Sequence, residues 1–349
     1  MRIKAIVIVS MVLVFVAVPL LAQAATTYRA TCNVPATQPP AMAMKYWGDL
    51  VTKKTNERFN FQYHWGGSLT KAGEELQAVR SGMANVGFYA MGYYPSLMVL
   101  NGVSYVVPFN PPDPRVLLRI YERLVRDVPE LAAEIEQHNQ KLMFYIPFAS
   151  YEILSTKPVK TLADFKGLKV GAIGATMPKW FEAVGAVPIS MPSPERYQAL
   201  QTGIIGASCM GFAPHDPFKL TDIAKHSTTV NLGSVILAPV VLNTDDWKKL
   251  SPEDQKLFLE AGREAGQWIA DKTMEEEAAI KAKWKGLGVA FYTLSASDKQ
   301  AWAEKVKSLP YDWAETWDKK GIAATKTMDA YLKAAADVGH KYPVSFSKK

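Results

Sequence analysis

Between residues 27 and 90, the hydrophobic positions alternate between a spacing of two and a spacing of three to four. The first spacing predicts strands and the second predicts helices with one apolar face. Strands are expected at 27–34, 59–65 and 85–90, with helices at 41–55 and 70–80 between them. This βαβαβ order favours a parallel sheet with helices on its faces.

A second alternation begins after Gln140. Strands are expected at 142–146, 168–173, 187–191, 206–210, 228–232 and 234–242, and helices at 178–184, 194–202 and 218–224. Two separate runs of alternating strands and helices predict an α/β protein with two halves.

A long helix is expected after Ser251, which can cap it ahead of Pro252, because the helical pattern continues to about Lys285 and stops at Gly286. About 34 helical residues would measure about 50 Å, more than the width of one domain. The helix is therefore expected to span both halves. Two further helices are expected, at 296–308 and 312–338.

The expected division of the chain places each lobe on two stretches of sequence. The first lobe takes 25–148 and 234–268, and the second takes 149–233 and 269–349, including the C-terminal helices.

The N-terminus has the pattern of an export signal. Arg2 and Lys4 precede an apolar stretch, 5–21, and the small residues Ala22 and Ala24 fit a signal-peptidase site. The alternative is a retained membrane anchor, but about 17 apolar residues are few for a bilayer span. Cleavage after residue 24 and a periplasmic location are therefore expected.

Composition excludes several functional classes. The formal charge of +7 falls to +5 without Arg2 and Lys4, and no long basic run is present, so nucleic-acid binding is not expected. Cys32 and Cys209 fall in different halves of the predicted fold and make no disulfide framework, so two buried thiols are expected rather than a bridge.

Catalytic and metal-binding motifs are not evident. The turn 171–176, Gly-Ala-Ile-Gly-Ala-Thr, lacks the glycine spacing of a nucleotide-binding loop, and 206–211 is one residue too long for a nucleophile elbow around Ser208. The five histidines are scattered, without metal-ligand spacing. No cofactor or metal is expected, and a secreted hydrolase using Ser208 remains an alternative.

Three stretches resemble the extracytoplasmic solute-binding proteins of tripartite ATP-independent periplasmic (TRAP) transporters. They read KPVKTLADFKGLKVGAIGA (157–175), VGAVPISMPSPERYQALQTGIIGAS (184–208) and LSPEDQKLFLEAG (250–262). The family typically carries K-P-v-k-t-p-x-D-l-k-G-l-K-i-R, then a-l-G-a-x-p-v-p-m-p-f-x-E-v-Y-x-A-L-q-t-G-v-v-D-G. The matched residues are Lys157, Pro158, Asp164, Gly167, Leu168, Lys169, Gly185, Ala186, Pro188, Met191, Pro192, Glu195, Tyr197, Ala199, Leu200, Gln201, Thr202 and Gly203. Looser matches lie at 76–88 and at Pro108 and Phe109.

The resemblance implies two α/β lobes that close on a small organic ligand, deliver it to the membrane permease subunits and perform no chemistry. A monomer is expected. A sensory binding protein that reports to a membrane kinase would use the same fold, so this alternative also stays open.

The chain departs from the family pattern at the expected ligand site. Where the family typically has an arginine that clamps the ligand carboxylate, this chain has Gly171, and Met210 replaces a common asparagine. A simple dicarboxylate is therefore not the expected ligand. A neutral, cationic, or apolar and aromatic ligand is expected instead, or a carboxylate held from elsewhere by Lys71, Arg80 or the helix end at Thr176.

Strand ends and the family cleft together indicate the candidate ligand contacts. Glu152, beside tyrosines, could suit a cation. The candidate binding residues are Trp65, Tyr89, Met91, Tyr94, Tyr151, Gly171, Thr176, Trp180, Met210 and Phe212.

Overall fold

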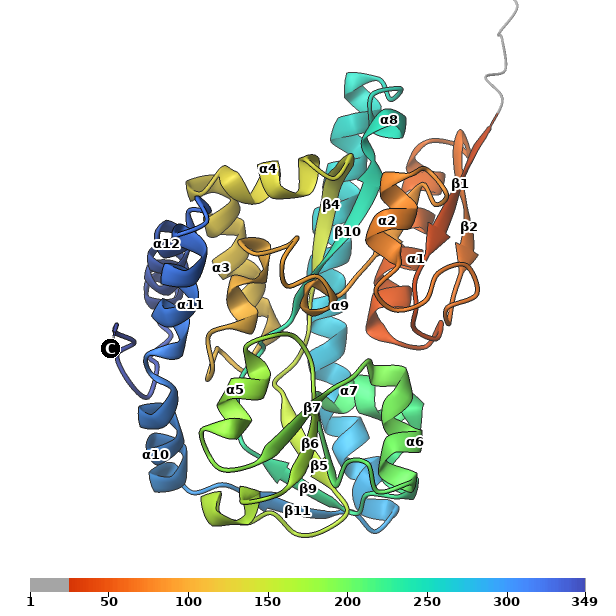
Figure 1. Ribbon diagram of the computed structural model, residues 1–349. Helices are drawn as coiled ribbons and strands as arrows, with labels where there is room; N and C mark the ends of the chain where they lie inside the picture. Colours follow the sequence, from red (N-terminus) through yellow and green to blue (C-terminus); the bar gives the residue numbers. More distant parts are fainter. Residues whose placement is uncertain (1–24, 349) are drawn as a thin grey trace, which may run out of the picture.

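A computed structural model describes residues 25–348, which form two α/β lobes side by side along one long helix (Figure 1). The predicted signal peptide lies outside the described residues. Within residues 25–348, none of the helices has both the length and the apolar character that crossing a bilayer requires.

Lobe I contains a five-stranded sheet in the order β2-β1-β3-β10-β4. The strands β1, β2 and β3 are parallel, as the βαβαβ pattern predicts, and β10 returns antiparallel between β3 and β4. The strands are β1 Thr26–Thr31, β2 Phe59–His64, β3 Val86–Phe88, β4 Gln140–Pro147 and β10 Leu237–Asn243. The helices are α1 Pro39–Lys54, α2 Glu75–Arg80, α3 Pro114–Asp127, α4 Glu130–Glu136 and α8 Thr244–Trp247.

Lobe II contains a six-stranded sheet in the order β11-β9-β5-β8-β6-β7. Its strands are β5 Glu152–Ser155, β6 Lys169–Ala172, β7 Val187–Ser190, β8 Ala207–Met210, β9 His226–Thr229 and β11 Ala290–Thr293. Its helices are α5 Met177–Glu182, α6 Arg196–Gln201 and α7 Phe212–His215. Because β6 runs parallel to β7 and β8, the carboxyl ends of all three strands meet at one edge of the sheet.

The long helix α9, Pro252–Gly286, has 35 residues and connects the two lobes. The Ser251 hydroxyl accepts a hydrogen bond from the Asp254 backbone N–H (3.1 Å) and so caps the helix. Helix α9 packs on α1, α3 and β4 in lobe I and on α7 in lobe II. The predicted two-lobed fold with a helix spanning both lobes is therefore confirmed.

Two chain segments also cross between the lobes, residues 148–151 and 230–236, and they are hydrogen-bonded to each other. The Phe148 N–H donates to the Ile236 carbonyl (3.0 Å), and the Tyr151 N–H donates to the Gly233 carbonyl (3.0 Å). We call this pair of segments, through which the chain passes between the lobes, the hinge.

The C-terminal helices differ from the predicted division. The helices are α10 Ala296–Val306, α11 Leu309–Asp318 and α12 Ala324–Asp337. Helix α12 packs against α3 of lobe I rather than on lobe II (Figure 1), and the Tyr331 hydroxyl donates to the Asn110 side chain (2.9 Å). The apolar face of α12 and that of α3 are buried against each other. The predicted single helix at 312–338 is broken because Gly321 adopts a positive φ of 79°.

Candidate functional site

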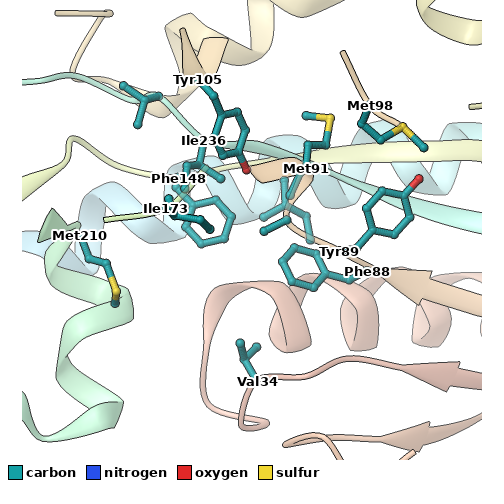
Figure 2. Packing of buried hydrophobic residues seen from close by; sticks show 14 of the residues in the cluster. Val34, Phe88, Tyr89, Met91, Met98, Tyr105, Phe148, Ile173, Met210 and Ile236 are labelled. Carbon is teal, nitrogen blue, oxygen red and sulfur yellow. The ribbon is translucent and has the colours of Figure 1, made fainter. Parts of the chain in front are cut away.

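A small cavity lies between the lobes, next to the hinge. Figure 2 shows Phe148, Ile173 and Ile236 close together at this place, with Val34 and Phe88 approaching from lobe I. The cavity is lined by Asn33, Val34, Gln38, Pro40, Phe88, Ala90, Tyr93, Phe148, Tyr151, Ile173, Ser193 and Ile236. Its volume is about 30 Å³, far below the roughly 300 Å³ or more of typical small-molecule pockets. An organic ligand would therefore fit in this cavity only if the lobes moved apart.

The small-residue turn after β6 forms part of the contact between the lobes. The Cβ that a side chain would place on Gly174 would lie 3.7 Å from the Gly92 Cα. A groove of about 490 Å³ borders this contact and shares Tyr93 and Ile173 with the cavity wall. The turn thus belongs to the mouth of the interlobe site and allows a close approach of two backbones.

Replacing Gly92 by alanine is expected to hinder lobe closure. The added Cβ would lie 2.9 Å from the Tyr105 ring and 3.1 Å from the Ile173 side chain of the other lobe. We expect roughly tenfold weaker binding of a cleft ligand, about 1.4 kcal/mol, measured by isothermal titration calorimetry. Gly102→Ala is the matched control, because a Cβ there would meet nothing within 4 Å. Equal affinities of the two variants would contradict this account of closure.

Several polar side-chain atoms around the cavity are buried without a hydrogen-bond partner among the described residues. From lobe I these are Asn33 Oδ1 and Gln38 Nε2, and both residues line the cavity. In lobe II, two nitrogens of Arg196 are also unpaired; Arg196 does not line the cavity itself but interacts with Tyr93 and Tyr151, which do. Buried polar groups are normally paired, so unpaired donors and an unpaired acceptor around one cavity indicate a site for a partly polar ligand.

Arg196 begins helix α6 and is fully buried, with an exposed fraction of 0%. Its Nη1 donates to the Ser208 hydroxyl (3.1 Å) and to the Cys209 carbonyl (2.7 Å), so β8 holds one side of the guanidinium. Burial lowers the pKa of Arg196, and the ionisable groups that act on it are Tyr151, Cys209 and Tyr93. Two of these, Tyr93 and Tyr151, line the cavity.

Glu152 connects the two crossing segments and is not free to hold a cation. It is 4% exposed, and one oxygen accepts from the backbone N–H groups of Val230 (2.6 Å) and Asn231 (3.0 Å). The other oxygen accepts from the Ser150 hydroxyl (2.7 Å). Its contacts make it a hinge residue.

Stability is expected to fall as pH rises through the titration range of Glu152. Burial raises its pKa from 4.5 to about 7, and the Glu277 charge adds to the effect. The unfolded chain therefore loses this proton first, so the free energy of unfolding falls from about pH 4.5 to 7, by up to ~3 kcal/mol, and then levels off. Burial also raises the pKa of Glu75 to about 7 and adds a similar effect. In Glu152→Gln, the difference in the free energy of unfolding between pH 5 and pH 8, measured by urea unfolding, should be smaller than in the wild type. An unchanged difference would show that groups other than Glu152 cause the pH dependence.

Three of the residues predicted to bind ligand line spaces between the lobes, and two more lie on strands of lobe II. Tyr151 lines the cavity. Gly171 and Met210 lie on neighbouring parts of β6 and β8, and both are buried. Met91 and Thr176 line a small space next to the Gly92–Gly174 contact.

The other five predicted residues contact none of the interlobe spaces described above and pack within a single lobe. Trp65 stacks on Tyr63, with ring centroids 4.8 Å apart. The Tyr89 hydroxyl donates to Gln140 (2.8 Å), and the Tyr94 hydroxyl donates to Glu75 (2.9 Å). Trp180 and Phe212 are buried in lobe II, where Phe212 packs on Trp284 with centroids 5.2 Å apart. In this protein these aromatic side chains pack within the lobes. The sequence pattern does not distinguish an aromatic residue that packs in a lobe from one that contacts a ligand.

Ser208 has a histidine neighbour that the sequence does not reveal. The Ser208 hydroxyl lies 3.0 Å from His215 Nε2. Both side chains are buried, the hydroxyl also accepts from Arg196, and neither residue lines the cavity. The Ser208 hydroxyl is thus held in a buried hydrogen-bond network with Arg196 and His215, and the hydrolase alternative is not favoured. Cys32 and Cys209 are buried free thiols, as predicted.

The charged groups proposed from sequence to replace the missing arginine do not reach the cavity. Lys71 and Arg80 are exposed, and Lys71 donates to the Gly67 carbonyl (3.0 Å). In residues 25–348, no group of three or more histidine, cysteine or acidic side chains could hold a metal ion.

Sequence reasoning missed Asn33, Gln38 and Arg196. The sequence held one signal for Arg196. The family pattern typically has valine between the glutamate and the tyrosine, whereas this chain has Arg196 between Glu195 and Tyr197. Asn33 and Gln38 follow β1 in a loop and at the start of α1, without a distinguishing motif.

Comparisons with known proteins agree with this two-lobed architecture. Residues 31–317 match the family described as bacterial extracellular solute-binding protein, family 7. The chain is similar to the C4-dicarboxylate-binding periplasmic protein of Rhodobacter capsulatus, with 27% identity over 81% of this chain and 84% of that protein. It is also similar to the ectoine-binding periplasmic protein of Halomonas elongata, with 23% identity over 80% of this chain and 82% of that protein.

Among solved structures, the fold is similar to a TRAP solute-binding protein from Rhodoferax ferrireducens in complex with copurified benzoate. The TM-score is 0.81 at 18% identity, covering 90% of this chain and 98% of that chain. Helices, sheets and lobes thus correspond over most of the molecule. Since the family match covers well over half of the sequence, this chain belongs to the bacterial extracellular solute-binding proteins of family 7.

Proposed function

We propose that this protein is the extracytoplasmic receptor of a TRAP transporter, and that it captures one small organic solute between its lobes for a membrane permease. The observation that carries this proposal is the interlobe cavity, with apolar and aromatic walls from both lobes and the unpaired polar atoms of Asn33 and Gln38 at its surface. The family membership, together with the predicted signal peptide, supports a periplasmic location. A monomer is the expected form.

A simple dicarboxylate is not the proposed cargo. The wall is mostly apolar and aromatic, and none of the residues that line it is charged; Arg196 interacts with two of them, Tyr93 and Tyr151. A second carboxylate would enter an apolar wall without a cationic partner, which is strongly unfavourable. Relatives bind solutes as different as C4-dicarboxylates and ectoine, so the family alone does not select a ligand.

A thermal-shift screen followed by recovery of the ligand tests the receptor role. The probes are benzoate, pyroglutamate, ectoine and succinate, together with benzyltrimethylammonium as a cation. A cleft ligand in excess should raise the melting temperature according to RT ln(1 + [L]/Kd), and proton NMR after release should show it unaltered. Conversion of a probe into a product would favour an enzyme, and a binding stoichiometry above one would contradict a single cleft site.

A further inference from the structure

A buried guanidinium without an anionic partner lies beside the cavity. The Nε and Nη2 atoms of Arg196 have no hydrogen-bond partner among the described residues, although the side chain is fully buried. Its ionisable neighbours, Tyr93, Tyr151 and Cys209, all have a raised pKa because of burial, so they carry no negative charge near neutral pH. An arginine stays protonated even when buried, and an uncompensated buried charge is strongly unfavourable. This environment lacks an anion.

The unpaired atoms form one edge of the guanidinium. The Nη1 atom is held by Ser208 and Cys209, which fixes the plane of the group and leaves the Nε and Nη2 edge without a hydrogen-bond partner among the described residues. Two parallel N–H groups on one edge match the two oxygens of a carboxylate.

The guanidinium lies next to the position from which the resembling family pattern supplies its arginine. A Cβ on Gly171 would lie 3.7 Å from Arg196 Nε and 3.0 Å from the Ile205 side chain. A side chain at position 171 would therefore press first on Ile205 and would lie in van der Waals contact with the Arg196 guanidinium. The chain thus places a guanidinium beside the position at which the resembling family pattern has its arginine.

We propose that Arg196 binds the carboxylate of the transported solute, and that the cargo is a small monocarboxylic acid with an apolar or aromatic body. This inference rests on the proposed receptor function and selects one ligand class within it. Phe88, Phe148 and Ile236 would contact the body of the acid. Asn33 and Gln38, each with an unpaired polar atom at the cavity, would bind a second, uncharged polar group.

Matched acid and amide probes test this proposal. Calorimetry would compare benzoate with benzamide, phenylacetate with phenylacetamide, and pyroglutamate with its amide, on the full mature chain. The variants are Arg196→Met and Arg196→Lys, and Arg263→Met is the control, because it removes the same charge from the exposed face of α9. In the wild type and the control, an acid should bind at least about 100-fold more tightly than its amide. Arg196→Met should abolish that preference, and Arg196→Lys should retain part of it.

A purely structural role for Arg196 predicts different results. Loss of its bonds to Ser208 and Cys209 would lower the melting temperature of ligand-free Arg196→Met and weaken acid and amide binding equally. We expect instead a ligand-free melting temperature equal to or above that of the wild type, with the loss confined to acids.

Tight binding of amides or of benzyltrimethylammonium, or an acid preference that survives in Arg196→Met, would overturn the arginine proposal while leaving the receptor function intact. Failure of all these probes, with no small molecule found in a solvent extract of the purified protein, would count against the receptor function itself.

Discussion

Gly233→Ala is expected to destabilise the protein by about 3 kcal/mol or more, because the new Cβ has no room at the hinge. Gly233 has a φ of 88°, a conformation that costs alanine roughly 1 kcal/mol. Its Cβ would also overlap the Asn110 backbone and lie 2.6 Å from the Asn110 nitrogen, and overpacking of this kind typically costs ~1–3 kcal/mol more. Urea unfolding at constant pH measures the change.

Gly339→Ala separates the two contributions. Gly339 has a similar φ of 84°, but a Cβ there would meet nothing within 4 Å, so only the conformational cost of about 1 kcal/mol is expected. If the two variants lost the same stability, the claim that a Cβ at Gly233 overlaps the Asn110 backbone would be contradicted.

An arginine on β6 in place of Gly171 is expected to have the second large effect, a loss of stability that depends on Arg196. Gly171→Arg alone would place a second guanidinium beside Arg196, in buried surroundings without an anion, at a cost of about 3–5 kcal/mol. Arg196→Val removes both the like charge and the volume that the new side chain needs. The double variant should therefore recover at least about 2 kcal/mol of that loss, and it should regain part of the acid binding that Arg196→Val loses.

A double-mutant cycle measures this coupling directly, because the free energies of unfolding of independent sites add. Additive effects of the two substitutions would show that positions 171 and 196 do not share one space, and would remove the geometric basis for a guanidinium beside position 171.

The fold was predictable from sequence where local patterns and tertiary packing agree. Ser251, Pro252 and an uninterrupted helical pattern predicted α9, and it forms as expected. The position of α12 was not predictable, because an amphipathic helix shows that one face is buried but not which surface covers it. Strand β11, at the edge of the second sheet, is short and only half buried, so its hydrophobic pattern is weak.

The site was predictable only in part, for a related reason. The strand pattern predicted Tyr151, which lines the cavity. It also predicted Gly171 and Met210 near the carboxyl ends of the parallel strands β6 and β8, which meet at one edge of the sheet. The position of a guanidinium depends on a long side chain that can reach the same point from a strand or from a neighbouring helix. Sequence alignment to the family pattern shows the glycine at 171, whereas only the three-dimensional arrangement shows that Arg196 lies beside it.

The crystal structure of the wild-type protein with its tightest-binding acid tests the central claim most directly. The account predicts one acid enclosed between the lobes, with both carboxylate oxygens on the Nε and Nη2 edge of Arg196 and its apolar body against Phe148 and Ile236. A ligand bound outside the interlobe cavity, or one inside it whose carboxylate points away from Arg196, would contradict it.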